Sequence, residues 1–362
     1  MIITTLVFLL IIGILVFVHE LGHFLVAKRN GILVEEFAFG FKPRLWGKKI
    51  GETVYAINLI PLGGYVKLYG EGEGETGERS FKNKTLFQRF QVLVAGSAMN
   101  LMLGFLVLTI LFGVGFQPIF PGVGDNPFIK EAPSVVIEQI APNSPASLSG
   151  LQPGDRVVTL DGNKASIYEL IAYVSQNIGK EVTLVVNRNG TEITKKLLAR
   201  KEYPQGQGPL GIALENAGEA KSSILLAPAS GAYETGKVIG LSVKGFALFV
   251  KDLVVKQEVS DDVTGLIGVG AVTGVARRMG IEYLAQLLVV ISIGLGVINL
   301  MPIMPLDGGH VVALGYQKVF GRPLSEKQMG YFVTFGLAFV ILMFLVVTYK
   351  DFIRFDVLNR LF

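Results

Sequence analysis

Four long apolar stretches limit what this chain can fold into more than any other feature of its sequence. They cover residues 1–27, 91–117, 283–306 and 328–349, and Glu20 is the one charged side chain in them. Each has about the 20 residues that an α-helix needs to cross the hydrocarbon core of a bilayer. The first stretch has no basic segment before it and is too long for a signal peptide, so we expect a retained helix. The sequence therefore predicts a polytopic α-helical membrane protein with four transmembrane helices.

The composition supports this class and excludes several others. Charged residues make up 17% of the chain, whereas ordinary soluble domains have about 25%. With 51% hydrophobic residues, the chain is too apolar to be intrinsically disordered. Its net charge of +4 comes from scattered residues and gives no basic footprint for nucleic acid. The absence of cysteine excludes disulfides, thiolate metal sites and cysteine nucleophiles.

The distribution of basic residues predicts the orientation of the helices. Lys28 and Arg29 follow the first apolar stretch, further lysines and arginines precede the second, and the next basic residue after it is Lys130. Basic residues are enriched in cytoplasmic loops of membrane proteins. We therefore expect residues 28–90 in the cytoplasm and residues 118–282 on the extracytoplasmic side.

Within the cytoplasmic region, residues 52–69 predict a β-hairpin. Two β-rich runs flank the turn-forming sequence Pro61–Gly64, which is a typical hairpin signal. This hairpin is very apolar for a segment outside the membrane. Either it enters the membrane interface or lines a cavity, where unpaired backbone is tolerated, or it packs as a small cytoplasmic hairpin on the helices.

The extracytoplasmic region contains one segment that resembles a PDZ domain, at residues 126–216. The resemblance rests on the sequences SPA at Ser144–Ala146 and GLQPGD at Gly150–Asp155, which occur once. PDZ domains bind peptides by adding a strand to a sheet edge. The alternative is a small β-rich module that only blocks access. The local patterns predict helices at 144–149 and 166–177 and strands at 156–160, 181–187 and 191–198.

Residues 217–282 are amphipathic and predict helices at the membrane surface. Lys237, Lys244 and Lys251 recur every seven residues among apolar side chains, as on a helix that lies against a lipid leaflet. An ordinary helix with a solvated lysine face is the alternative. The tail, residues 350–362, predicts a further interfacial helix.

The first apolar stretch carries the chemistry. It contains the sequence HExxH at His19, Glu20 and His23, and the chain has only one other histidine. On a helix, residues four apart share one face, so both imidazoles can bind one Zn²⁺ while Glu20 lies beside a zinc-bound water. Ionisable groups inside a membrane span are costly and are functional by default. We therefore predict a zinc site within the first transmembrane helix.

A catalytic zinc ion needs a third protein ligand and an open position for water. Two candidates lie in the sequence NLMPIMPLDGGH, at the end of the third transmembrane helix, which we place at 283–310. Asp307 is favoured because prolines interrupt the helix there, and an acid on a broken segment can face a cavity. The alternative ligand is His310.

These motifs together resemble the site-2 protease family of intramembrane zinc metalloproteases, and more closely its bacterial RseP-type regulators of sigma-E signalling. The likeness covers nearly the whole chain. It implies that His19, His23 and Asp307 hold zinc and that Glu20 is catalytic. It also favours a membrane-associated hairpin. By the same resemblance, the residues expected to contact substrate are Asn299, Asn100, in a GxxxN motif that starts at Gly96, and the hairpin glycines Gly63 and Gly64.

Three departures from the family pattern stand out. Ser97 replaces a proline that often follows the motif glycine, Pro305 lies one place later than is common, and enterobacterial relatives have two PDZ domains where this chain shows one. None of them affects a predicted ligand. The single PDZ domain leaves open how substrates are filtered.

The resemblance also implies a function. We expect peptide-bond hydrolysis within transmembrane segments of single-pass proteins, such as anti-sigma factors or remnant signal peptides, after an upstream site-1 protease has trimmed them. The protein would lie in the lipid bilayer of a bacterial inner membrane, with the PDZ domain excluding untrimmed substrates. The alternatives are a non-catalytic PDZ scaffold and a metal transporter. Transporters usually repeat ionisable positions across several spans, and the second and fourth spans here have none.

Overall fold

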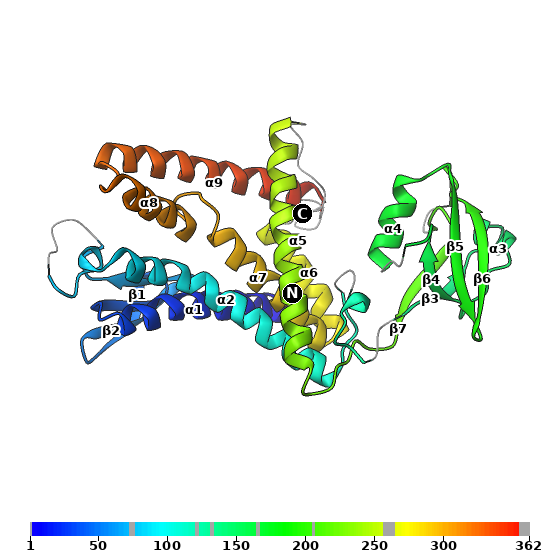
Figure 1. The fold of residues 1–362 in the computed structure, drawn as a ribbon, viewed down its shortest axis with the longest axis horizontal. Coiled ribbons are helices and arrows are strands. Elements are labelled where there is room, and N and C mark those ends of the chain that lie inside the picture. The colour runs from blue at the N-terminus through cyan, green and yellow to red at the C-terminus, as the bar shows by residue number, and fades with distance from the viewer. Residues whose placement is uncertain are drawn as a thin grey trace. The chain divides into compact units, whose positions relative to one another are not determined.

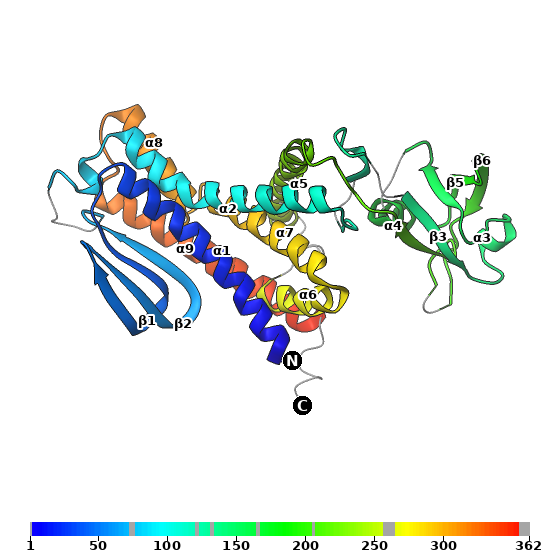
Figure 2. The same ribbon diagram turned by 90° about the horizontal axis from the view of Figure 1, so that it is seen from below.

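The computed structural model describes residues 2–71, 77–119, 123–130, 134–163, 167–204, 207–255 and 265–354. The chain divides into two compact units (Figures 1 and 2). The first unit consists of residues 1–107 and 235–362, and the second of residues 108–234. Helices α2 and α5 each contribute to both units, because the division falls within them.

Four of the described helices are long and apolar enough to cross a membrane, so the chain is a multi-pass membrane protein. They are α1 (Ile2–Arg29), α2 (Leu86–Val114), α7 (Ile281–Asn299) and α9 (Glu326–Arg354). Three further helices belong wholly or partly to the first unit: α5 (Ala227–Val255), α6 (Leu266–Met279) and α8 (Asp307–Phe320). Two short 3₁₀ turns are at Phe81–Asn83 and Val123–Asp125.

The predicted spans differ from the helices at several ends, and two of these differences concern the second and third spans. The second helix begins at Leu86, ahead of the predicted residue 91. The third does not continue to residue 310, because α7 ends at Asn299 and α8 begins at Asp307. Between them lie Pro302 and Pro305, and proline can neither donate a backbone hydrogen bond nor leave its fixed φ. The LDG motif therefore opens a separate helix.

For the amphipathic region and the tail, the structure tests the predicted helices but not their predicted place at the membrane surface. Residues 227–255 are helical, as the lysine spacing predicts, and residues 266–279 form a second helix in the region expected to be helical. Their position at a membrane surface stays a prediction. The helix α9 continues to Arg354, and the rest of the predicted tail helix lies outside the described residues.

The predicted β-hairpin is present, but the predicted position of its turn, at Pro61–Gly64, is wrong. Strand β1 (Val34–Ile50) pairs antiparallel with β2 (Thr53–Leu68), so the turn is at residues 51–52, where Gly51 has a φ of +61°. Both strands bend. Residues 34–39 therefore pair with 64–68 on one side, and residues 36–39 pair with 54–57 on the other. The Pro61–Gly64 sequence forms one of these bends.

This sheet packs along α1 (Figure 2). The Phe37 ring lies edge-on to Phe17 and Phe24, with centroid distances of 5.8 and 5.2 Å. Farther toward the N-terminus of the helix, a Cβ atom on Gly13 would lie 3.2 Å from the Phe39 ring. The contacts extend from Phe24 to Gly13, which is about 16 Å along a helix at 1.5 Å per residue. The sheet therefore follows the first span well into its apolar part.

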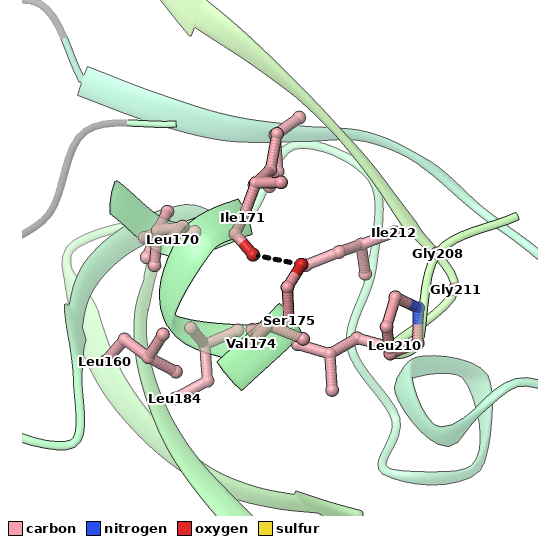
Figure 3. A pocket seen from close by; sticks show the side chains of 13 residues that line it. Leu160, Leu170, Ile171, Val174, Ser175, Leu184, Gly208, Leu210, Gly211 and Ile212 are labelled. Carbon is pink, nitrogen blue, oxygen red and sulfur yellow. Dashed lines mark hydrogen bonds between the residues drawn. The ribbon is translucent and has the colours of Figure 1, made fainter. Parts of the chain in front are cut away.

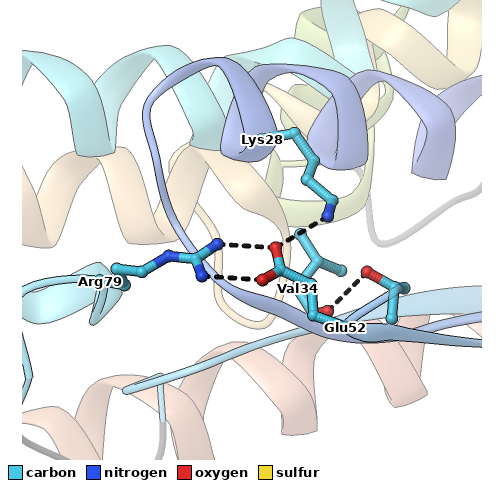
Figure 4. A network of polar contacts seen from close by, with 5 residues as sticks. Lys28, Val34, Glu52 and Arg79 are labelled. Carbon is cyan, nitrogen blue, oxygen red and sulfur yellow. Dashed lines mark hydrogen bonds and ion pairs between the residues drawn. The ribbon is translucent and has the colours of Figure 1, made fainter. Parts of the chain in front are cut away.

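At the end of the sheet that contains the β1–β2 turn, ion pairs connect the turn to neighbouring segments (Figure 4). Glu52, in the β1–β2 turn, accepts hydrogen bonds from both Nη atoms of Arg79, at 2.6 and 2.7 Å, and from Lys28 Nζ at 3.0 Å. These partners, Arg79 above all, lower the pKa of the Glu52 carboxyl to about 2. Next to it, Thr53 Oγ1 donates to the Val34 carbonyl at 2.8 Å. The turn is thus tied to the basic end of α1.

The second unit is an antiparallel five-stranded sheet with the order β6-β5-β4-β3-β7. Its strands are β3 (Ser134–Ile140), β4 (Arg156–Leu160), β5 (Glu181–Arg188), β6 (Thr191–Leu198) and β7 (Ile212–Ala217). The helices α3 (Pro145–Leu148) and α4 (Ile167–Gln176) accompany it. The strands and helices predicted here are confirmed, whereas β3 and β7 were not predicted from the sequence.

A buried ion pair holds the GLQPGD loop in this unit. The Asp155 side chain is 1% exposed, and it accepts hydrogen bonds from Arg188 Nε at 2.6 Å and Nη2 at 2.8 Å. The backbone N–H of Gln152 donates to the same carboxylate at 2.9 Å. Arg188 lowers the pKa of the Asp155 carboxyl below its ordinary value. The loop and strand β5 are thereby joined.

We expect D155N to destabilise this unit by about 2–3 kcal/mol, because it leaves a partly buried guanidinium without its counter-charge. Since the folded-state pKa of Asp155 is lowered, its stabilising effect is complete at neutral pH and disappears as the pH falls through that pKa. In D155N, the stability of this unit should therefore no longer fall with the titration of this carboxyl group. Hydrogen exchange of β4 and β5 in the full chain measures both effects.

The exposed substitution E192Q on β6 is the control. If D155N exchanged no faster than E192Q at neutral pH, the ion pair would not contribute to the stability of this unit.

Candidate metal centre

Three side chains from opposite ends of the chain converge on one point. His19 and His23 project from one face of α1, and Asp307 is the first residue of α8. The distance between the two Nε2 atoms is 3.2 Å, and Asp307 Oδ2 lies 3.3 and 3.4 Å from them. Ligands about 2.0–2.1 Å from a tetrahedral zinc ion are about 3.3 Å apart. The three atoms therefore form one face of a zinc-sized tetrahedron.

The chemistry of these atoms also fits a cation. His23 Nδ1 lies 2.8 Å from the Val92 carbonyl oxygen, to which it donates, so the lone pair of His23 is on Nε2. Asp307 Oδ2 is buried and has no hydrogen-bond partner within the described structure. Electron-rich atoms at these distances repel one another unless a positive charge lies between them. Two imidazoles and one carboxylate are a common zinc ligand set.

Close backbone packing directs Asp307 toward the histidines. Residues 300–306 fold against the first turn of α8, where a side chain on Gly308 would lie 2.2 Å from the Met301 carbonyl. A side chain on Gly309 would lie 2.7 Å from the Met304 nitrogen. Gly309 N–H donates to the Leu306 carbonyl at 2.9 Å. The glycines after Asp307 therefore let the proline-containing loop return onto the helix.

Glu20 lies against the edge of the β1–β2 sheet. A side chain on Gly64 would come within 3.1 Å of Glu20 Cγ, and the backbone N–H of Val66 donates a hydrogen bond to the Glu20 carboxylate. Residues 64–68 pair only with residues 34–39 in the described sheet. The open edge of residues 64–68 is therefore next to the Glu20 carboxylate.

The other predicted site residues have different positions. Asn100 is fully buried, and its Nδ2 lies 3.3 Å from His19 Nδ1. Asn299 is the partly exposed last residue of α7. Gly63 has a φ of +107°, and a side chain there would meet the Phe41 ring at 2.3 Å. His310 is exposed on α8 and does not belong to the convergent group.

The sequence analysis named Gly96 only as part of a motif and missed its position. A Cβ atom on Gly96 would lie 2.4 Å from His23 Nε2 and 2.7 Å from His19 Nε2. These are the two atoms that face Asp307. A glycine four residues before Asn100 could have indicated this contact, because the two positions share one face of a helix.

Comparison with known proteins agrees with this geometry. Residues 7–343 match the profile of peptidase family M50. A protein of Clostridium acetobutylicum whose name marks it as a candidate zinc metalloprotease is 33% identical, over 95% of either chain. The zinc metalloprotease RasP of Bacillus licheniformis is 28% identical, over 96% of this chain and 98% of its own. The regulator of sigma-W protease RasP of Bacillus subtilis is 27% identical, with the same coverage.

We expect G96A to weaken zinc binding by on the order of 100-fold, because the added methyl group overlaps both imidazoles and small ligand displacements have effects of this size. Competition with a chelator in detergent measures the affinity. The control is G113A on the same helix, where the nearest atom to the new methyl group is 3.8 Å away. Equal zinc affinity of G96A and G113A would show that the imidazoles do not need this space.

Proposed function

Because the chain belongs to peptidase family M50 and is a zinc metalloprotease, we propose that it hydrolyses peptide bonds within transmembrane segments of single-pass membrane proteins. His19, His23 and Asp307 hold the zinc ion, and Glu20 is the catalytic base. One observation carries this proposal. The two histidines of a span-length apolar helix and the Asp307 carboxylate of α8 bring three ligand atoms within 3.4 Å of one another. A metal site at this depth acts on substrates that are themselves in the membrane.

The roles of the side chains follow from their chemistry. Zinc, when bound, polarises the scissile carbonyl and lowers the pKa of a water molecule to about 7. Glu20 takes a proton from the attacking water and delivers it to the leaving amide nitrogen. The Val66 N–H orients the Glu20 carboxylate before substrate arrives. Asn299 is a candidate to orient the substrate peptide with its amide.

The strand edge beside Glu20 could bind the substrate as an added β-strand. The peptide bonds of a transmembrane helix are hydrogen-bonded within the helix and must be released before cleavage. Residues 64–68 offer an open edge on which an unwound segment can pair as an added strand. Gly64, which has no side chain between the edge and Glu20, lets this strand come close to the carboxylate.

We expect E20Q to bind zinc like the wild type and to cleave a trimmed single-pass substrate about 10²–10⁴-fold more slowly, because it lacks the proton acceptor. H23A should lose zinc as well as cleavage. Zinc content and cleavage in detergent, measured on the same samples, separate the two effects. Cleavage by E20Q at the wild-type rate would refute the role of Glu20, and zinc without cleavage by the wild type would favour a transporter.

The second unit supports a role as a PDZ-type substrate filter on the extracytoplasmic side. Strand β7 is an edge of the five-stranded sheet and contacts α4. An apolar groove of about 240 Å³ lies beside them (Figure 3). Its wall includes Leu160, Leu170, Ile171, Val174, Leu210 and Ile212. A sheet edge beside an apolar groove is how PDZ domains accept a peptide strand.

In this proposal the filter admits single-pass proteins that an upstream site-1 protease has shortened, such as anti-sigma factors or remnant signal peptides. The name of the Bacillus subtilis relative, regulator of sigma-W protease, supports a substrate class linked to sigma factors. A bacterial cytoplasmic membrane is the corresponding location.

We expect deletion of residues 134–217 to allow cleavage of untrimmed substrate, while the ability to cleave trimmed substrate is retained. These boundaries keep Asn126, whose side chain donates to the Ser230 carbonyl at 3.1 Å. Cleavage of both substrates is compared in proteoliposomes. A deletion variant that still requires trimming would refute the filter.

A second pair of variants separates peptide binding from steric exclusion. I171E places a charge in the groove, whereas A172E places it on an exposed position of the same helix outside the groove. If the groove binds the trimmed end, I171E raises KM for trimmed substrate and A172E does not. Equal KM values would leave exclusion by size as the mechanism.

A further inference from the structure

The two metal-facing histidines differ in how their second nitrogen is held. A neutral imidazole has one N–H, so a histidine that binds metal through Nε2 must carry its proton on Nδ1. Metal-binding histidines almost always donate that proton to an acceptor, which sets the orientation of the ring. His23 has such an acceptor in the Val92 carbonyl, 2.8 Å from its Nδ1. His19 needs an equivalent one.

The group that faces His19 Nδ1 is the side-chain amide of Asn100. This residue has 0% exposure, and its Nδ2 is 3.3 Å from Nδ1. In this orientation Oδ1 is buried without a hydrogen-bond partner among the described residues. When His19 binds metal through Nε2, two N–H donors would also face each other. A half-turn of the amide exchanges its nearly equivalent nitrogen and oxygen and removes both defects.

We propose that Asn100 is a positioning residue for the metal centre. Its side-chain oxygen accepts a hydrogen bond from Nδ1–H of His19 and thereby directs the Nε2 lone pair at the metal. This proposal rests on the proposed function of His19 as a zinc ligand. It replaces direct substrate binding as the main role of Asn100.

The spacing of residues on α2 supports this assignment. Val92, Gly96 and Asn100 follow at intervals of four and so form one stripe along the helix. The Val92 carbonyl serves His23, the amide of Asn100 serves His19, and Gly96 leaves room for both rings between them. One helix therefore supplies the acceptors for both histidines and the space that they occupy.

Helix α7 holds Asn100 in place. The Ser292 hydroxyl donates a hydrogen bond to the Asn100 backbone carbonyl at 2.7 Å, and both groups are buried. This contact involves the backbone and leaves the side-chain amide to His19. It also provides a matched control, because it can be removed without changing the amide.

The test compares N100L, N100D and S292A in the full-length protein. Leucine keeps the approximate size and removes the acceptor, whereas aspartate keeps the acceptor and removes the N–H donors. We expect N100L to bind zinc about 10–100-fold more weakly than the wild type, and N100D and S292A to bind within about threefold of it. Affinity is measured by chelator competition. The visible spectrum of the Co²⁺-substituted protein should change in N100L only.

Three results would overturn the proposal. Wild-type zinc affinity in N100L would show that His19 does not depend on this acceptor. Equal losses in N100L and S292A would show that only packing matters. A higher KM in both N100D and N100L, with zinc affinity unchanged, would make Asn100 a substrate contact. A wild type that binds no zinc would instead refute the proposed function, so the two failures are distinguishable.

Discussion

Burying ionisable side chains among apolar helices costs free energy, and much of this structure serves to lower that cost. A buried carboxylate or imidazole without a partner is strongly unfavourable, yet His19, His23 and Asp307 are brought together within a bundle of span-length helices. The neighbouring elements compensate for this arrangement in different ways. Helix α2 offers acceptors and space, the β1–β2 sheet offers a backbone donor to Glu20, and the break between α7 and α8 offers the carboxylate. A continuous third helix could not have provided it.

Close approach of helices makes this compensation possible. A side chain on Gly22 would lie 2.4 Å from the Ala95 carbonyl of α2. One on Gly336 of α9 would lie 2.2 Å from the carbonyl of Met304, in the loop between α7 and α8. Small residues at such contacts let helix backbones approach closely, which is how helices associate in lipid. The same residue type thus has two uses here. At Gly22 it brings α1 and α2 together, and at Gly96 it leaves room for the ligands.

The sequence predicted what local patterns encode. The spacing of His19 and His23 places both on one face of any helix, and the prolines before Asp307 indicate that an acid there can leave the helical direction. Phe37, Phe39 and Phe41 alternate along strand 34–50 as in a β-strand. Its pairing with β2 could not be predicted, because both strands bend and change partners along their length. Gly96 and Val66 act through an absent side chain and a backbone N–H. The backbone contact of Val66 leaves no chemical signature in the sequence, and the position of Gly96 is indicated only by its spacing from Asn100.

The position of Asp307 has a consequence for biosynthesis. His19 and His23 emerge from the ribosome before Asp307, which follows only after three of the four span-length helices in the described structure have been made. Until then, the nascent chain has only two of the three proposed metal ligands. Closing the loop between these distant residues is entropically costly, and a metal ion that joins them acts as a cross-link between the two ends of the chain. In this proposal the metal centre is completed only once the helices that carry its three side chains have come together.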